Sequence, residues 1–264
     1  MRCRDQVVVI TGASMGIGET LTRTFAAEGA QVVMSSRKPD ALEQARSRVR
    51  VDDRTTAVAC DVRERDQILA LVQQTKDRFG KIDVWVNNAG YGLLDSIASM
   101  SMDECREIFD TNFFGAIDCM QAVIPIFKEQ RRGTIINISS IVGHLPVPHL
   151  GAYSATKHAL NAISEAARLE LEPDGIRVMS VCPGRIQTQF GANTVRGREG
   201  KRLGECFQRG ISAERCARAI LRGYLRGSRE VFVPWHGGVI AHLYEMFPWV
   251  VEFAMRRMLK GKKS

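Results

Sequence analysis

The chain has 264 residues, of which 45% are apolar and 25% charged, and its formal net charge is +8. This balance is typical of a soluble globular protein and excludes a disordered or fibrous chain. The length is enough for one ordinary hydrophobic core, so we expect a single domain over residues 1–264. The positive surplus raises nucleic acid, membrane surfaces and acidic ligands as partners.

The surplus of positive charge is confined to the last quarter of the chain. Residues 1–195 hold 22 basic and 23 acidic residues, whereas residues 196–264 hold 15 basic and 6 acidic ones. The seven cysteines are scattered and never spaced C-x-x-C, so we expect neither a disulfide framework nor a metal site. A strand-like run starts almost at Met1 and leaves no room for a signal peptide, so we expect a cytoplasmic protein.

Apolar runs rich in β-branched residues recur along the chain, with helix-like segments between them. They predict about seven strands, in the runs Val7–Ile10, Gly29–Met34, Thr56–Cys60, Gly80–Val86, Gly133–Ile138, Gly175–Val181 and Val231–Val233. In four of these runs an initial glycine is expected to close the preceding helix. Continuous apolar runs that alternate with helices predict an α/β fold with a doubly wound Rossmann-type parallel sheet.

A glycine-rich turn directly follows the first run and precedes helix-forming residues. Backbone N–H groups in such a turn can approach a pyrophosphate, and the start of the helix favours its negative charge. The turn therefore predicts a dinucleotide site, with a ligand-free tight turn as the plain alternative. The expected contacts are Gly12, Ser14, Met15, Gly16, Ile17 and Gly18.

The end of the second run bears on the choice between NAD and NADP. A carboxylate there would bind the ribose 2′-hydroxyl and repel a 2′-phosphate. The sequence has Ser36, Arg37 and Lys38 instead. A hydroxyl and two cations suit a phosphate, and Arg37 can bind it through two hydrogen bonds. We therefore expect NADP(H), with an exposed basic turn as the alternative.

Tyr153 and Lys157 lie four residues apart, on one face of an expected helix. Other motifs occur with this pair in chain order: Thr11–Gly18, Asp61-Val62, Asn87–Gly90, Asn112, Ser139-Ser140, and Pro183-Gly184 with Thr188. Over about residues 5–190 the chain therefore resembles the short-chain dehydrogenase/reductase family.

The resemblance implies four catalytic residues. Tyr153 would exchange a proton with a carbonyl or an alcohol, and a nearby cation can lower the pKa of a phenol from about 10. Lys157 would supply that charge and bind the nicotinamide ribose. Ser140 would hydrogen-bond the substrate oxygen, and Asn112 would hold a water that links Lys157 to solvent.

The resemblance also implies further cofactor contacts at the ends of the later strands. Asp61 and Val62 would contact the adenine. The adenosine ribose would lie against Asn87, Asn88, Ala89 and Gly90. The nicotinamide would lie beside Tyr153 and Lys157 and against Pro183, Gly184, Ile186 and Thr188.

Two apolar segments and a basic loop bear on the substrate. Tyr91–Leu94 and Ile141–Leu150 favour a small hydrophobic carbonyl or alcohol, such as a steroid, a lipid or an aromatic carbonyl, unless they pack on their own core. Residues 189–211 are expected to form a substrate lid. Their positive charge leaves an acyl-carrier-type 3-ketoacyl reductase open, although the long segment after Val233 argues against it.

This C-terminal extension, residues 235–264, is similar to that of hydroxysteroid-dehydrogenase-like members, where it covers the substrate site, joins subunits or touches membrane. A helix would align one apolar stripe, kinked at Pro248 and followed by a basic cluster: Leu243, Met246, Phe247, Val250, Val251 and Met255. We expect it to pack on the subunit's own core or on a partner in a homodimer or homotetramer. Peripheral contact with an anionic membrane is the alternative.

Two other functions compete with that of an oxidoreductase. A non-catalytic NADP(H)-binding sensor or scaffold would have no need of the intact set Asn112, Ser140, Tyr153 and Lys157. Nucleic-acid binding would need aromatic residues among the cations of the lid, or a recognition motif, and the sequence has neither. We therefore expect an enzyme and no nucleic-acid partner.

Overall fold

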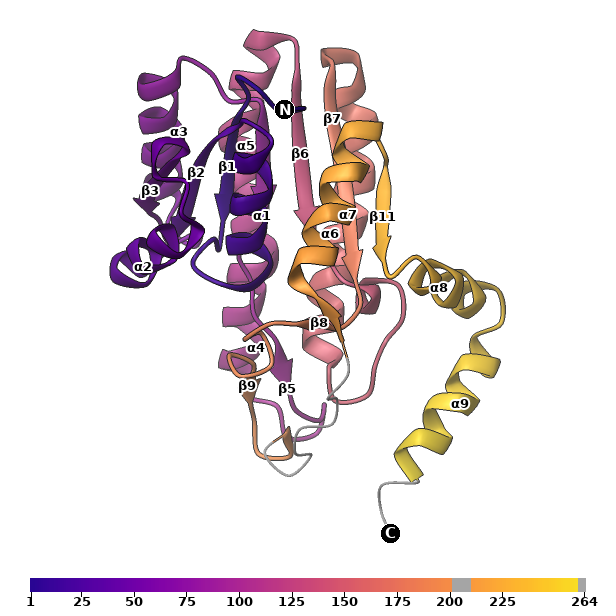
Figure 1. Ribbon diagram of the computed structural model, residues 1–264. Helices are drawn as coiled ribbons and strands as arrows, with labels where there is room; N and C mark the ends of the chain where they lie inside the picture. The colour runs from indigo at the N-terminus through magenta and orange to yellow at the C-terminus, as the bar shows by residue number, and fades with distance from the viewer. Residues whose placement is uncertain (201–209, 261–264) are drawn as a thin grey trace.

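The computed structural model describes residues 1–200 and 210–260 of the chain. The described residues form a seven-stranded parallel sheet with the strand order β11-β7-β6-β4-β1-β2-β3. Its strands are β1 Val7–Thr11, β2 Gln31–Ser36, β3 Thr55–Ala59, β4 Val84–Asn87, β6 Gly133–Ile138, β7 Ile176–Pro183 and β11 Glu230–Val233. The chain starts at β1, moves outward to β3, and returns through β4 toward the other edge (Figure 1). The expected doubly wound Rossmann-type sheet is confirmed.

Helices cover both faces of the sheet, as Figure 1 shows. The longer helices are α1 Gly16–Ala27, α2 Pro39–Val49, α3 Arg65–Phe79, α4 Met102–Phe109, α5 Gly115–Gln130, α6 Gly151–Leu171, α7 Ala213–Arg226, α8 His236–Met246 and α9 Pro248–Lys260. Short helical turns are η1 Asp52–Arg54, η2 Asp110–Phe114, η3 Ile141–Gly143 and η4 Glu172–Asp174, of which η2 is a π-helix.

Two hydrophobic cores lie on opposite faces of the sheet. Val8 and Ile10 of β1 pack into the core that α1, α2 and α7 cover, whereas Val9 faces the core under α3, α5 and α6. All five residues of β1 are buried, which explains why the run is apolar without alternation. Full burial of one such side chain contributes about 1.5–3 kcal/mol, so these central strands hold the site at their ends firmly in place.

The prediction that Gly133 closes the preceding helix is wrong. The left-handed residue after α5 is Arg131, with φ of 55°, and Gly133 instead begins β6. A Cβ atom on Gly133 would lie 2.2 Å from the ring of Phe127. This glycine therefore serves close packing of α5 on the sheet, a role that its spacing in the sequence does not reveal.

Residues 189–200, the described first part of the expected lid, pair with the body through short strands. β9 Val195–Arg196 lies parallel to β5 Leu93–Leu94. On either side of residues 201–209, which lie outside the described ranges, β8 Ile186–Gln187 pairs with β10 Ile211–Ser212. The sequence gives no sign of these two-residue strands, because their partners are distant in the chain.

The C-terminal extension forms two helices rather than one kinked helix. α8 ends at Met246 and α9 starts at Pro248, because a proline fits the first turn of a helix but not its interior. Figure 1 shows α9 projecting from the body beyond α8. Within the described ranges, no helix combines the length and apolar character needed to cross a bilayer.

Candidate active site

The expected site residues gather at the carboxyl edge of the sheet. Gly12 follows β1, Asn88 follows β4, Ser140 follows β6, and Pro183 ends β7. Parallel strands end at one edge, and ligands of such sheets bind in the crevice there, where the strand order reverses. The strand order therefore brings together motifs that are as much as 170 residues apart in the sequence.

The glycine-rich turn is built for close approach of the backbone. Gly12 and Gly16 adopt positive φ angles of 63° and 59°. A Cβ atom on Gly18 would lie 2.5 Å from the carbonyl oxygen of Gly12, so no larger residue fits there. Met15 precedes α1 without a side-chain cap, which leaves the first N–H groups of the helix for a ligand.

Asn88 and Thr11 fix the turn against the neighbouring strand. The Asn88 amide nitrogen donates to the carbonyl oxygens of Thr11 and Gly12 at 2.9 and 3.0 Å. The Thr11 hydroxyl accepts hydrogen bonds from the backbone N–H groups of Asn88 and Ala89. Asn87, in contrast, is buried and bonded to Trp85 and Asn137, so its amide stabilises the strands.

The end of β2 carries a buried hydroxyl beside two exposed cations. Ser36 Oγ is buried and has no hydrogen-bond partner in the described part of the chain. Arg37 and Lys38 follow it with exposed side chains. Arg37 lies near enough to Asp61 to help lower the pKa of that carboxyl group, although Arg63, which donates to it at 2.6 Å, has the larger effect.

Tyr153, Lys157 and Ser140 form a buried cluster. The ammonium nitrogen of Lys157 lies 5.9 Å from the centre of the Tyr153 ring and donates to the carbonyl oxygen of Ile138 at 2.9 Å. Burial raises the pKa of Tyr153 to about 12, against a hydrogen bond with Ser140 that lowers it. Burial also lowers the pKa of Lys157 to about 8. The phenol pKa thus moves opposite to the expected direction, because loss of hydration outweighs the hydrogen bond with Ser140.

Asn112 lies in the π-helical turn η2, between α4 and α5. Its side-chain oxygen accepts a hydrogen bond from the backbone N–H of Tyr91 at 3.0 Å, and its amide nitrogen donates to the Tyr91 carbonyl and to Thr156. Both polar atoms of the side chain are therefore hydrogen-bonded to protein, although the oxygen accepts only one bond and can accept a second. The expected role of Asn112 in holding a water stays a prediction. π-Helical turns of this kind occur frequently at functional sites.

The remaining expected cofactor residues lie along the same edge. Ser14 and Ile17 belong to the glycine-rich turn and the start of α1, and Val62 is buried beside Asp61. A Cβ atom on Gly90 would lie 2.9 Å from Asn112 Oδ1 and 3.8 Å from Lys157 Nζ.

The carbonyl of Pro183, at the end of β7, accepts a hydrogen bond from Ser140, and Gly184 donates its N–H to the carbonyl of Val233. Ile186 begins β8, and Thr188 lies against Gly16.

Phe190 lies beside Tyr153, and Asp95 holds the segment that carries Phe190; the sequence context of these two residues does not reveal either contact. The ring of Phe190 lies 5.6 Å from that of Tyr153. Asp95 is buried, and its carboxylate accepts hydrogen bonds from Ser99 and from the backbone N–H of Glu199. Both contacts join the segment after β8 to the body. The pairings of β9 with β5 and of β8 with β10 lie on either side of Phe190 in the chain.

The two apolar segments form a small core around Tyr153. Leu93, Val142 and Tyr153 are buried in it, and Tyr91 and Leu150 pack against it partly exposed. The buried members thus pack on their own core, as the alternative interpretation of the sequence has it. The partly exposed members remain the candidates for contact with a substrate.

A cluster of three metal-ligating side chains lies near the end of β7. His144, Cys182 and Glu230 offer donor atoms within 4.8 Å of one another. These residues are far apart in the sequence, so their spacing gives no sign of the cluster. In the structure they bind each other: His144 Nε2 and Cys182 Sγ lie 2.8 and 3.2 Å from Glu230 Oε1. The expectation of no metal stays a prediction.

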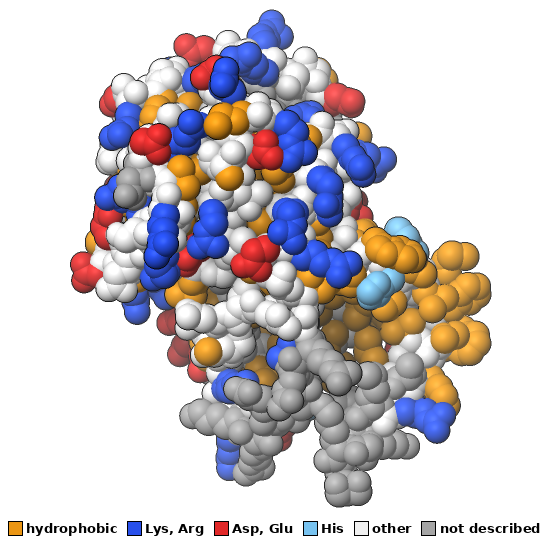
Figure 2. All heavy atoms as spheres, in the orientation of Figure 1, with side chains coloured by type: hydrophobic (Ala, Val, Ile, Leu, Met, Phe, Trp, Pro, Cys, Tyr) orange, Lys and Arg blue, Asp and Glu red, His pale blue; other side chains and the backbone are white. Residues whose placement is uncertain are grey.

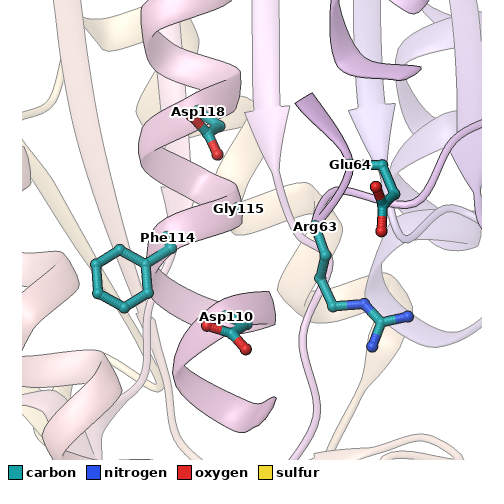
Figure 3. Close-up of a pocket in the computed structure, with 6 residues that line it drawn as sticks. All are labelled: Arg63, Glu64, Asp110, Phe114, Gly115 and Asp118. Carbon is teal, nitrogen blue, oxygen red and sulfur yellow. The ribbon is translucent and has the colours of Figure 1, made fainter. Parts of the chain in front are cut away.

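A charged pocket of about 330 Å³ is lined by residues other than those of the Tyr153 cluster. Figure 3 shows its lining coming from two segments, the turn at Arg63 and Glu64 and the helical run that carries Asp110 to Asp118. Ser140, Tyr153 and Lys157 take no part in it. Its charged lining does not suit a hydrophobic substrate.

The fold and the site together define a dinucleotide-binding oxidoreductase, and comparisons with known proteins give the family. A family model described as short chain dehydrogenase matches residues 6–199. An uncharacterized oxidoreductase of Staphylococcus saprophyticus is 34% identical over 220 residues, which cover 82% of this chain and 89% of that protein. The chain belongs to the short-chain dehydrogenase/reductase family, whose members use a nicotinamide cofactor.

Two solved structures show how similar folds accept different cofactors. A short chain dehydrogenase from Burkholderia cenocepacia in complex with NADP is 26% identical, with a TM-score of 0.82 and coverage of 97% of this chain and 99% of that one. The 3-ketoacyl-(acyl-carrier-protein) reductase from Brucella melitensis complexed with NADH is 29% identical, with a TM-score of 0.75 and coverage of 83% and 91%. Similarity of fold therefore leaves the choice between NAD and NADP to local residues.

Proposed function

We propose that the protein is an NADP(H)-dependent reductase of a hydrophobic ketone or aldehyde, or the corresponding dehydrogenase of an alcohol. The observation that carries the proposal is the buried cluster of Tyr153, Ser140 and Lys157 beside the glycine-rich turn. The phenol lies in an apolar core, and the partly exposed members of that core would contact the carbon chain of a hydrophobic carbonyl substrate.

The residues present fit a nicotinamide cofactor. The cradle at Gly12 and Gly18 leaves no room for a side chain, and the uncapped start of α1 suits a pyrophosphate. When bound, the cofactor supplies or accepts the hydride. Tyr153 Oη then gives a proton to the carbonyl oxygen, or takes one from the alcohol. Ser140 Oγ donates a hydrogen bond to that oxygen, and Lys157 keeps positive charge near the phenol.

The preference for NADP(H) rests on the end of β2. Ser36 has a buried hydroxyl without a partner in the described ranges, and the two exposed cations Arg37 and Lys38 follow it. A 2′-phosphate would accept hydrogen bonds from all three groups. A buried hydroxyl is costly to leave unbonded, so a ligand that engages Ser36 would gain from it.

Replacement of Tyr153 by Phe tests the catalytic assignment. The change keeps the buried ring and removes only the hydroxyl, so we expect turnover to fall at least about 100-fold while NADPH still binds. Initial rates of NADPH oxidation with a panel of hydrophobic carbonyl compounds measure the loss, and nucleotide fluorescence measures binding. Tyr244→Phe, in α8, is the matched control. Turnover by Tyr153→Phe close to that of the natural protein would contradict the mechanism.

Replacement of Arg37 by Asp tests the choice of cofactor. Loss of a charge-assisted hydrogen bond and the new like-charge repulsion should raise the KM for NADPH by about tenfold or more, and favour NADH. Arg78→Asp, at the other end of the sheet, should leave both KM values unchanged. An unaltered preference in Arg37→Asp would show that Arg37 is only a surface residue.

A 3-ketoacyl thioester substrate is the second candidate, and the similarity to the Brucella melitensis reductase favours it. The same panel separates the two, since it includes a 3-ketoacyl thioester beside steroid and aromatic ketones. A non-catalytic sensor would bind NADPH with no turnover on any compound. In that case Tyr153→Phe would change nothing.

A further inference from the structure

Helix α8 turns its small residues inward and its large apolar residues outward. Gly237, Gly238 and Ala241 face the body and are buried. A Cβ atom on Gly238 would lie 2.9 Å from the ring of Phe232, and one on Gly237 would lie 3.0 Å from Ile141. The close packing of this helix therefore fixes which side faces the body, and the large side chains cannot turn into the core.

The outward face of α8 and its flanks is apolar and exposed. Its members have exposed fractions between 40% and 74%: Trp235, Val239, Ile240, Leu243, Met246 and Phe247. At 100° per residue they occupy one side of the helix, opposite the two glycines. Figure 2 shows the resulting orange area over α8 and α9. These residues do not pack on the subunit's own core, so of the expected packing on the core or on a partner only the partner is left for them, and that stays a prediction.

Helix α9 extends the apolar face and adds positive charge at its end. Trp249 and Phe253 are 70% and 63% exposed and lie on the same side of the helix, four residues apart. Arg256 and Arg257 follow one turn later with exposed side chains. The sequence after Glu252 contains no acidic residue, and Lys262 and Lys263 follow in its last three positions.

We propose that this face, from Trp235 to Arg257, docks on an anionic lipid bilayer. Tryptophan side chains favour the boundary between headgroups and acyl chains, and Trp235 and Trp249 are both exposed here. Arginine and lysine beside such a face are attracted to acidic headgroups. Since no described helix could cross a bilayer, α8 and α9 lie along the surface rather than through it.

The charge of the segment favours lipid over a second copy of the chain. Residues 235–264 carry a net charge of +3, from 5 basic and 2 acidic residues, and all 5 basic residues follow Glu252. A symmetric pairing of this face would bring two such charges together, whereas acidic headgroups neutralise them. The inference is independent of the proposed reaction, because it rests only on exposure and charge.

Sedimentation of the full chain with vesicles tests the proposal. Binding to vesicles of 70% phosphatidylcholine and 30% phosphatidylserine should be about tenfold or more tighter than to pure phosphatidylcholine, and should weaken as salt is raised to about 0.5 M. The double variant Trp249→Ser/Phe253→Ser should lose at least tenfold in affinity. Arg256→Gln/Arg257→Gln should reduce the preference for phosphatidylserine.

Matched exposed residues elsewhere provide the controls. Leu169→Ser removes an apolar side chain 64% exposed on α6, and Arg131→Gln/Arg132→Gln removes two adjacent arginines before β6. Neither should change vesicle binding. Equal or absent sedimentation with both vesicle types would overturn the proposal. So would a dimer, seen by light scattering, that Trp249→Ser/Phe253→Ser dissociates, because the occupant would then be a second copy.

Discussion

Burial acts on Tyr153 and Lys157 in opposite directions. It raises the pKa of the phenol to about 12 and lowers the pKa of the ammonium group to about 8, because it disfavours the charged form of each. The neutral phenol, which donates a proton in carbonyl reduction, is thus favoured at neutral pH. Alcohol oxidation needs the phenolate, and only the hydrogen bond with Ser140 lowers the pKa of Tyr153 toward it.

Ser140→Ala should therefore shift the pH dependence of alcohol oxidation as well as slow it. A hydrogen bond of about 0.5–1.5 kcal/mol corresponds to about 0.4–1 pH unit. Loss of this bond raises the pKa of Tyr153 further, so the rising limb of rate against pH should move upward by that amount. Initial rates between pH 6 and 11 measure it. Ser139→Ala, whose hydroxyl donates to Lys157 O, should leave the limb in place. A superimposable Ser140→Ala profile would contradict the assignment.

At the scale of elements, the sequence predicts those features that depend on local patterns. Continuous apolar runs predict the strands because each strand of a buried parallel sheet must be apolar on both faces. The close approach of the backbone at Gly12 and Gly18 and the nearness of Tyr153 to Lys157 could be predicted, because each depends on particular residue types at short spacing. Phe190, by contrast, meets Tyr153 across a long separation in sequence, so no local pattern reveals the contact. The His144–Cys182–Glu230 cluster is likewise made by tertiary packing, so no spacing reveals it.

The segment that carries Phe190 is held by Asp95. Its carboxylate accepts hydrogen bonds from Ser96, Ser99 and the backbone of Glu199, next to the β5–β9 pair. Asp95→Ala should release this segment, so trypsin should cleave after Arg196 or Arg198 about three- to tenfold faster. Timed proteolysis with mass spectrometry measures the rate. Asp103→Ala, an exposed carboxylate that binds Arg106, is the control. Unchanged cleavage would show that the strand pair holds the segment without Asp95.

At the scale of the whole molecule, the surplus of positive charge and the exposed apolar face of α8 and α9 both belong to the last quarter of the chain. Residues 1–195, which supply six of the seven strands of the sheet, are nearly neutral in sum. The surplus belongs to the last quarter of the chain, which also supplies α7 and β11 to the body. Helix α8 packs on the body through Gly237 and Gly238, which lie against Ile141 and against Phe232 of β11. His144 and Glu230 form an ion pair at this junction. The strength of this ion pair therefore affects how tightly the C-terminal helices are held against the body.

This ion pair should make stability depend on pH. A hydrogen bond with Glu230 raises the pKa of His144 against the effect of burial. Burial raises the pKa of Glu230, but hydrogen bonds from His144 and Cys182 outweigh it, so that pKa is lowered. Because folding raises the pKa of the histidine, its charged form stabilises the folded state below about pH 6.5, and this stabilisation is lost at higher pH. Because folding lowers the pKa of the carboxyl group, its charged form stabilises the folded state above about pH 4.3, and this stabilisation is lost at lower pH. The pair therefore contributes most between about pH 4.5 and 6.5.

Glu230→Gln should reduce the free energy of unfolding more at pH 5.5 than at pH 8, by about 1 kcal/mol for a partly exposed pair. Urea unfolding of both proteins at the two pH values measures the difference. Glu245 also faces His144, at 3.9 Å, and binds His242, so Glu245→Gln is the control for the more exposed charge. It should show a smaller pH-dependent loss, because its side chain is 55% exposed and that of Glu230 is 30% exposed. A Glu230→Gln loss that is equal at both pH values would mean that His144 binds Glu230 as a neutral ring, through a hydrogen bond alone.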